Sequence, residues 1–171
     1  TSVQTLRNYY VYAEDIDGDG VMELPSLITM KRVFPEQEGK QKFLIRWFAM
    51  DLEGREMDKF FTFHNYLGGW YMQLASSWAP RVSVDQDGGR YTFYVWDEDY
   101  REASDVFSIY VLTGGSREED ATVDGRFAFY RAEGVVYAAK LEANAAEFGI
   151  TENQLINSFH LIQQAWKTGE T

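Results

Sequence analysis

The chain has 171 residues, 45% of them hydrophobic and 16% aromatic, and its formal net charge is −11. This composition is typical of a well-packed globular protein with one ordinary domain or two small ones, and it excludes a disordered chain. The acidic charge is spread along the sequence with no basic stripe, so nucleic acid and anionic membrane are poor partners. Cysteine is absent, which excludes disulfides, thiolate zinc sites and cysteine nucleophiles.

No apolar run approaches the roughly 18 residues that a membrane-spanning helix needs. The chain opens on Thr1 and shows no signal peptide. We therefore expect it to be a processed or trimmed piece of a longer protein, and an anchor or export signal can have been removed with the missing part.

An acidic loop, DIDGDGVME at residues 15–23, follows the first predicted strand at residues 9–13. Counted from Asp15, the acidic residues Asp15, Asp17, Asp19 and Glu23 occupy positions 1, 3, 5 and 9. Spacing by two lets alternate side chains point into a curled loop, and carboxylates supply the hard oxygens that calcium prefers. Without a cation, each pair of neighbouring carboxylates would cost about 1–4 kcal/mol. The pattern therefore predicts a cation site, with a metal-free Asp-Gly turn as the alternative.

The loop is not an EF-hand, because its position 12 holds Ser26 in place of a bidentate glutamate and its flanks are strand-like. It resembles the calcium loop of the FG-GAP repeats in integrin-type β-propellers, in which Asp-x-(Asp/Asn)-x-Asp-Gly-x-x-Asp lies between strands. The resemblance implies five ligands: Asp15, Asp17, Asp19, the carbonyl of Val21, and Glu23. Glu23 departs from the usual aspartate, and a single copy cannot form a propeller. We expect a structural rather than a catalytic calcium, because no histidine or other base lies nearby in sequence.

Further strand patterns follow the loop. Aromatic and β-branched runs predict strands at residues 27–33, 43–50, 60–66, 70–74, 81–84, 91–96, 106–112, 126–131 and 135–141. Glycine-containing turns separate many of them, at residues 53–54, 87–89, 114–115, 124–125 and 133–134. Such turns supply the positive φ angles of tight hairpins, so the sheet should be mostly antiparallel.

The end of the chain changes to a helical period. Thr151 and Gln154 form a capping-box pattern. An apolar stripe at helical spacing follows, made of Leu155, Phe159, Ile162 and Trp166. The stripe predicts an amphipathic helix that packs on the sheet. A shorter helix is expected at residues 143–148, ended by a left-handed glycine at position 149.

These elements predict an α+β fold: a mostly antiparallel sheet, a C-terminal amphipathic helix packed on it, and an N-terminal β extension. The pair Gly68-Gly69 suggests a boundary between a β-rich segment at residues 1–67, which carries the acidic loop, and an α+β domain at residues 68–171. One continuous α+β domain with an N-terminal extension also fits the pattern.

Other acidic and basic side chains have plainer explanations. Asp85 and Asp87 fit a hairpin turn. The run at residues 97–99 fits a solvated loop, with a second cation site as the lesser alternative. His64 and His160 fit surface or core positions better than general bases, so the hydrolase hypothesis ranks below the binding hypotheses.

Aromatic side chains leave a binding alternative open. Trp47, Trp70, Tyr71, Trp78 and Trp96 could stack on sugar rings or hold a peptide, but such residues in alternating strands are more often part of a core.

The second half of the chain carries another resemblance. The order GWYMQLASSWAPRVSVD, YTFYVWDE, DVFSIYVLTG, RFAFYRAEGVVYAAKLE and LINSFHLIQQAW resembles the small α+β modules of the PsbP-like superfamily. It is also similar to domains of uncharacterised exported lipoproteins from Firmicutes, in which a Ser-Phe pair lies on the helix, here Ser158-Phe159. The resemblance implies a fold and a cell-envelope setting, and it carries no site residues.

Together these patterns predict an extracytoplasmic, non-enzymatic binding or scaffolding domain of a bacterial surface protein or lipoprotein, with a structural calcium. Its expected partner is a protein or glycan at the cell surface, with no nucleic acid and no membrane contact of its own. The runner-up is a carbohydrate- or peptide-binding module that uses exposed aromatics.

Overall fold

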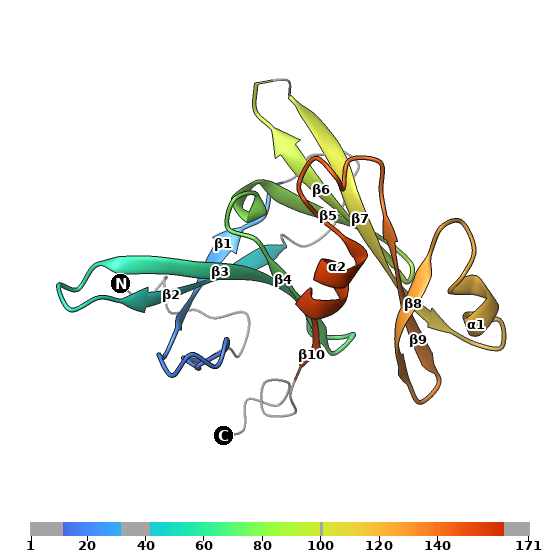
Figure 1. The fold of residues 1–171 in the computed structure, drawn as a ribbon, viewed down its shortest axis with the longest axis horizontal. Coiled ribbons are helices and arrows are strands. Elements are labelled where there is room, and N and C mark those ends of the chain that lie inside the picture. Colours follow the sequence, from blue (N-terminus) through green and yellow to red (C-terminus); the bar gives the residue numbers. More distant parts are fainter. Residues whose placement is uncertain (1–11, 32–41, 100, 163–171) are drawn as a thin grey trace. The chain divides into compact units, whose positions relative to one another are not determined.

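The computed structural model describes residues 12–31, 42–99 and 101–162, and strands dominate them (Figure 1). The first sheet consists, in spatial order, of β1 (Leu24–Thr29), β2 (Phe43–Met50), β3 (Glu56–Asn65), β4 (Trp70–Leu74) and β10 (Phe159–Leu161). The second sheet consists of β5 (Val82–Asp87), β6 (Arg90–Asp97), β7 (Glu102–Thr113), β9 (Val135–Leu141) and β8 (Phe127–Ala132). Every strand pair in both sheets is antiparallel, as the sequence predicts.

The two sheets belong to two compact units, between which the chain alternates. Among the described residues, the first unit contains 12–30, 42–80 and 158–162, and the second contains 31, 81–99 and 101–157. The boundaries of these units do not coincide with the predicted boundary after residue 67. Independent folding of residues 1–67 and 68–171 stays a prediction. No helix in the described ranges combines the length and the apolar character that crossing a bilayer requires.

Most strand positions agree with the sequence pattern, but the strand predicted at residues 27–33 lies at Leu24–Thr29, and residues 12–13 of the strand predicted at 9–13 are not in a strand. The bounds of β2, β4 and β9 are those predicted from the aromatic and β-branched runs. Gly54, Gly88 and Gly134 have φ angles of 78°, 58° and 74° in the turns that join β2 to β3, β5 to β6 and β8 to β9. Glycine adopts this left-handed region at no steric cost, which is why these turns can be so short.

The predicted α+β class is wrong, because the described chain contains very little helix. Its helical segments are α1 (Arg117–Asp120), α2 (Glu152–Ser158) and the 3-10 turn η2 (Ala79–Arg81). The longest of these, α2, has seven residues. The N-terminal segment, expected as a β extension, contributes β1 to the edge of the first sheet. The fold is therefore a β-rich one with two antiparallel sheets.

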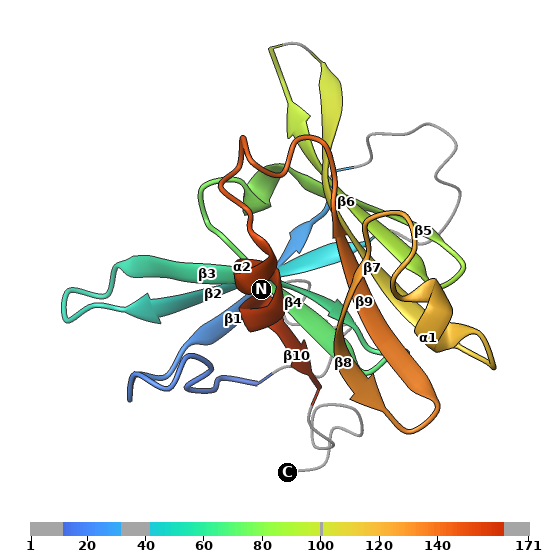
Figure 2. The same cartoon turned by 45° about the vertical axis from the view of Figure 1, so that its right-hand side comes forward.

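The expected C-terminal amphipathic helix begins as predicted but ends early. The Thr151 amide donates to Gln154 Oε1 at 2.9 Å and the Gln154 amide to Thr151 Oγ1 at 3.3 Å, which confirms the capping box. After α2, however, the chain extends as β10 and pairs with β4 (Figure 2). The ring of Phe159 stacks on Trp70 with centroids 5.6 Å apart. Pairing with a sheet edge thus outweighs the helical period, and Trp166 lies outside the described residues.

The prediction of a shorter helix at residues 143–148 is also wrong, but the left-handed glycine predicted at its end is confirmed. Residues 143–149 form a succession of turns. Gly149 has a φ of 67°, its amide donates to the Ala146 carbonyl, and the Ile150 amide donates to the Ala145 carbonyl at 3.0 Å. This is the hydrogen-bond pattern of a Schellman motif. The glycine signal therefore predicts the turn correctly without a helix before it.

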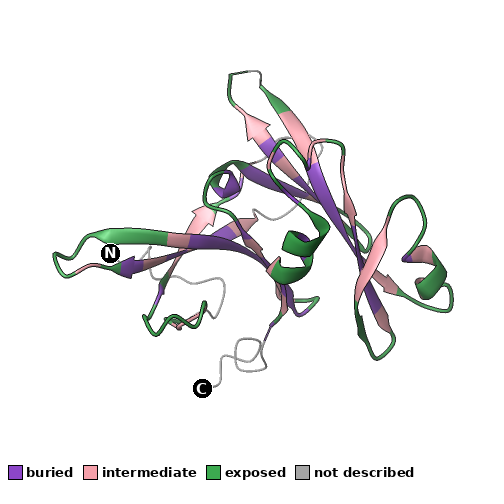
Figure 3. Ribbon diagram, viewed as in Figure 1, coloured by how far each residue is buried: buried purple, intermediate pink, exposed green. Residues whose placement is uncertain are grey.

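The core of the first unit lies against the middle of its sheet. Ile45, Trp47, Phe60 and Ile162 form a buried cluster. Trp47 Nε1 donates a hydrogen bond to Thr62 Oγ1 at 2.9 Å, so the polar atom of this buried ring is satisfied. Figure 3 shows that β3 is exposed near its turn with β2 and buried toward its other end, beside β4.

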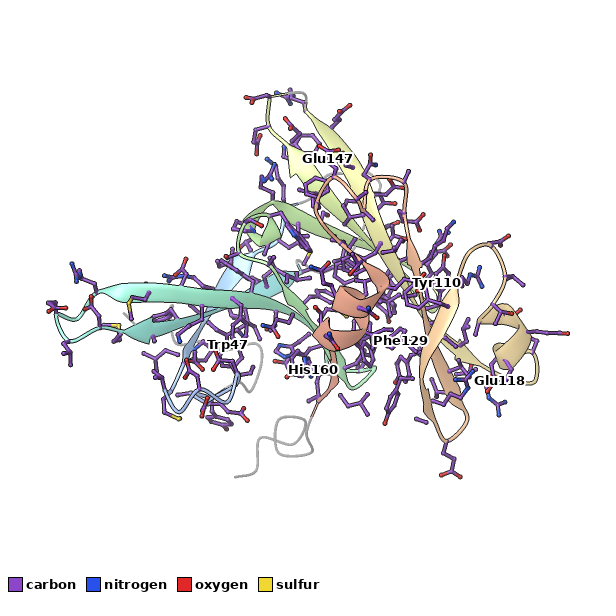
Figure 4. The ribbon with its side chains drawn as sticks, in the orientation of Figure 1. Trp47, Tyr110, Glu118, Phe129, Glu147 and His160 are labelled. Carbon is purple, nitrogen blue, oxygen red and sulfur yellow. The ribbon has the colours of Figure 1, made fainter. Side chains whose placement is uncertain are left out.

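The core of the second unit lies on both faces of its sheet. The rings of Phe93 and Phe107 stack on one face with centroids 4.3 Å apart. On the other face, Tyr110 packs in a cluster with Ala121, and the guanidinium of Arg126 lies 4.1 Å from the centroid of the Tyr110 ring (Figure 4 labels Tyr110). Each sheet thus carries a cluster of buried apolar side chains.

The turn between β5 and β6 provides a test of this packing. A Cβ atom at Gly89 would lie 2.5 Å from the carbonyl oxygen of Val111 on β7, a backbone atom that cannot turn aside. We expect Gly89→Ala to lower the free energy of unfolding by about 1–3 kcal/mol, the usual cost of overpacking. Gly115→Ala is the matched control, because a Cβ there meets nothing within 4 Å. Urea unfolding of both variants measures the difference, and equal effects would contradict the described β6–β7 contact.

Candidate metal centre

The acidic loop is closed at its base by a pair of backbone hydrogen bonds. The Glu14 amide donates to the Glu23 carbonyl at 3.1 Å, and the Glu23 amide donates to the Glu14 carbonyl at 2.9 Å. Between them, Gly18 and Gly20 have φ angles of 76° and 86°. These left-handed glycines let the chain reverse within a few residues, as the sequence pattern predicts.

Side chains inside the loop fold the backbone around three carboxylates. Asp15 Oδ2 accepts a hydrogen bond from the Gly20 amide at 2.9 Å, and Asp19 Oδ1 accepts one from the Val21 amide at 2.8 Å. Asp17 Oδ1 accepts one from the Asp19 amide at 3.1 Å. One carboxylate oxygen from each of the three aspartates lies within 4.8 Å of the others. The predicted spacing thus brings Asp15, Asp17 and Asp19 together, as a set that could hold a metal ion.

Glu23 differs from the three aspartates in being completely buried. Its side chain has no solvent exposure. Oε2 accepts a hydrogen bond from the Ile16 amide at 3.2 Å, and Oε1 accepts none from the described residues. Burial raises the pKa of Glu23 above its usual value, and the charges of Asp17 and Asp19 raise it further. Glu23 therefore lies within electrostatic reach of the cluster, with one oxygen unsatisfied.

A lysine from the sheet contacts the loop. Lys59 Nζ lies 2.5 Å from Asp19 Oδ2. This hydrogen bond is the main reason why the pKa of Asp19 is lowered and that of Lys59 is raised. The contact joins residues 40 positions apart. Lys59 could not be identified from the sequence, because nothing in its strand pattern signals a partner in the loop.

A hydrophobic contact also fixes the loop on the sheet. Ile16, between two of the acidic residues, packs against the cluster that contains Trp47 and Phe60. Figure 4 labels Trp47 on the first sheet. Burial raises the pKa of Tyr71 on β4 to about 12, and the charge of Glu14 adds to this effect. The geometry of the acidic cluster is therefore linked to the core of the first unit.

The donor set indicates which metals the loop can hold. The predicted ligands are all oxygen atoms, and four of them belong to carboxylates. Hard divalent cations prefer such donors, whereas zinc prefers nitrogen and sulfur ligands. The structure brings together the three aspartates of the predicted set. Coordination by Glu23 and by the carbonyl of Val21 stays a prediction.

The other acidic candidates form turns and ion pairs. Asp87 pairs with Arg90 across the β5–β6 turn, which confirms the predicted hairpin. Asp97 Oδ1 accepts a hydrogen bond from the Asp99 amide at 2.8 Å. Glu98 forms an ion pair with Lys31. In the described parts of the chain, the aspartates at 15, 17 and 19 are the group that meets the spacing of a metal site.

The two histidines lie on either side of Tyr71 in the first sheet. The ring centroid of His64 is 4.7 Å from that of Tyr71, and the ring of His160 stacks on Tyr71 at 4.9 Å. Figure 4 labels His160 on β10. His64 is buried, and burial lowers its pKa to about 3. An imidazole with this pKa is a weak general base at neutral pH, and of the surface and core positions predicted for the histidines, His64 occupies a core one.

The tryptophans proposed as sugar platforms are largely in the cores. Trp47, Trp70 and Trp78 are buried, so they do not offer a ring face to a sugar. Trp96 is partly buried and lies under the ammonium of Lys31, 5.0 Å from its ring centroid. The structure thus gives no support to a carbohydrate platform built from these rings.

The chain has no significant match to a protein-family model, to a curated protein or to a solved structure. The resemblances to FG-GAP calcium loops and to PsbP-like modules therefore rest on the sequence motifs alone and stay predictions.

Burial of His64 predicts a pH dependence of stability. The unfolded state takes up a proton near the ordinary pKa of 6.5, whereas the folded state takes it up only near pH 3. The contribution of His64 to the free energy of unfolding is therefore fully present above pH 6.5 and is lost as the pH falls toward 3. Between pH 7 and pH 5 we expect His64 to account for a loss of about 2 kcal/mol.

Urea unfolding at these two pH values, in the wild type and in His64→Leu, measures this contribution. The variant should lose about 2 kcal/mol less than the wild type between pH 7 and pH 5. His160→Gln is the control, because His160 is only half-buried and its pKa is lowered less strongly. An equal pH dependence in the wild type and His64→Leu would show that His64 is not buried as described.

Proposed function

We propose that this chain is a binding or scaffolding domain of an extracytoplasmic bacterial protein, and that its loop at residues 15–23 holds a structural calcium ion. The observation that carries the proposal is the buried carboxylate of Glu23, whose Oε1 accepts no hydrogen bond from the described residues. A buried carboxylate whose charge is only partly compensated is unfavourable. A cation bound between Glu23 and the three aspartates would compensate this charge.

Calcium fits the loop better than magnesium does. It accepts six to eight oxygens at variable angles, including backbone carbonyls, whereas magnesium requires near-ideal octahedral geometry and retains several waters. In the proposed site, Asp15, Asp17 and Asp19 supply carboxylate oxygens, Val21 its carbonyl, and Glu23 the buried carboxylate. Water would complete the coordination on the exposed side, where Asp17 and Asp19 face solvent.

The proposed role of the ion is to hold the loop on the first sheet. Ile16 packs in the core between two ligands, so fixing the ligands also fixes this side chain. All four acidic residues of the loop are used as ligands, which leaves none of them for acid–base catalysis. Extracytoplasmic location is supported by the resemblance to loops of extracellular repeats. Extracellular calcium modules bind with a Kd of about 10⁻⁴–10⁻³ M.

Addition of calcium should raise the melting temperature of the wild-type protein, and a chelator should reverse the change. A ligand that binds only the native state stabilises it by RT ln(1 + [L]/Kd), which gives about 1.4 kcal/mol at ten times Kd. Differential scanning fluorimetry with 0 to about 10 mM CaCl2 covers the expected affinity range.

Asp17→Asn and Asp97→Asn form a matched pair for this experiment. Both aspartates accept a hydrogen bond from the amide two residues later, which asparagine can also accept. Asp17→Asn should lose most of the calcium-dependent increase, whereas Asp97→Asn should keep it. No calcium effect in the wild type, or an equal effect in both variants, would contradict the proposed site.

A further inference from the structure

We infer that Lys59 is an internal counter-ion of the acidic loop, which pairs with Asp19 when no metal is bound and competes with calcium for the same carboxylate oxygen. The inference rests on the proposed calcium site and concerns its regulation. By this inference, Lys59 on the neighbouring strand sets the affinity of the site for calcium.

The position of Lys59 depends on an irregularity in the first sheet. Trp47 lies opposite Phe60, but Phe48 lies opposite Asp58, so Lys59 is the extra residue of a β-bulge. In a regular strand, Lys59 and Phe60 would point to opposite faces. Here Lys59 contacts Asp19 while Phe60 packs in the cluster with Ile16, and both partners belong to the loop. The bulge therefore directs the ammonium to the loop, a common use of bulges beside functional sites.

Several charges hold the ammonium of Lys59 at the loop. Asp19 Oδ2 is its hydrogen-bond acceptor at 2.5 Å, and the carboxylates of Asp17 and Glu23 attract it as well. A single ammonium, however, does not satisfy every buried carboxylate oxygen of the acidic loop. Asp15 Oδ1 and Glu23 Oε1 are buried and accept no hydrogen bond from the described residues. Lys59 thus stabilises the loop while leaving acceptors that a divalent ion would satisfy.

This arrangement predicts how calcium affinity changes when Lys59 is removed. If Lys59 only supported the loop, its removal would weaken calcium binding, because the ligands would be less well ordered. If Lys59 competes with the ion, its removal frees Asp19 and takes away a positive charge that repels calcium. Affinity for calcium should then increase although the metal-free protein becomes less stable.

Isothermal titration calorimetry of CaCl2 into Lys59→Met and wild-type protein tests this inference. We expect the variant to bind calcium about tenfold more tightly, as the removal of a unit charge beside a divalent ion implies. Lys140→Met is the matched control, because Lys140 is similarly exposed and pairs at 3.6 Å with Glu142, which is not a residue of the loop. It changes the net charge equally and should bind within about twofold of the wild type.

Lys59→Gln and Lys59→Arg complete the set. Lys59→Gln also removes the charge and should tighten binding, whereas Lys59→Arg keeps it and should bind within about threefold of the wild type. Calcium binding by the wild type with equal or weaker binding by both neutral variants would overturn the inference and leave the calcium site intact. The absence of calcium binding in the wild type and in all variants would refute the calcium site, and the competition with it.

Discussion

A carboxylate withdrawn from water must find donors or a counter-charge, because an isolated buried charge is strongly unfavourable. Glu23 is in this situation at the base of the acidic loop, with one oxygen on the Ile16 amide and the other without a hydrogen bond from the described residues. Its backbone also closes the loop by pairing with Glu14. The path of the loop therefore depends on how the charge of Glu23 is compensated, and the proposed calcium ion would compensate it.

The same loop is connected to the sheet by an apolar and an ionic contact. Ile16 packs in the core cluster of the first unit, and Asp19 pairs with Lys59. Because the bulge in β3 directs Lys59 and Phe60 toward the loop together, one local irregularity serves both contacts. Binding of a cation in the loop would thus be coupled to the stability of the sheet, which is what a structural metal site requires.

Local patterns made the strands and the loop predictable. Alternation and turn glycines are properties of neighbouring residues, so the bounds of β2, β4 and β9 and the curled loop could be derived from the sequence. The early end of the C-terminal helix could not be derived in this way. Phe159 lies in a helical pattern, and it forms a strand because it pairs with the edge of β4. Lys59 could not be found either, since its position depends on a bulge and on a partner 40 residues away.

A crystal structure determined from crystals grown with millimolar CaCl2, with an anomalous difference map, tests the central claim most directly. The account predicts a peak in the loop with six to eight oxygens at about 2.3–2.6 Å. These oxygens should include carboxylate oxygens of Asp15, Asp17 and Asp19 and Oε1 of Glu23. An ordered loop without a peak, with Lys59 still on Asp19 and Glu23 still buried without a cation, would contradict it.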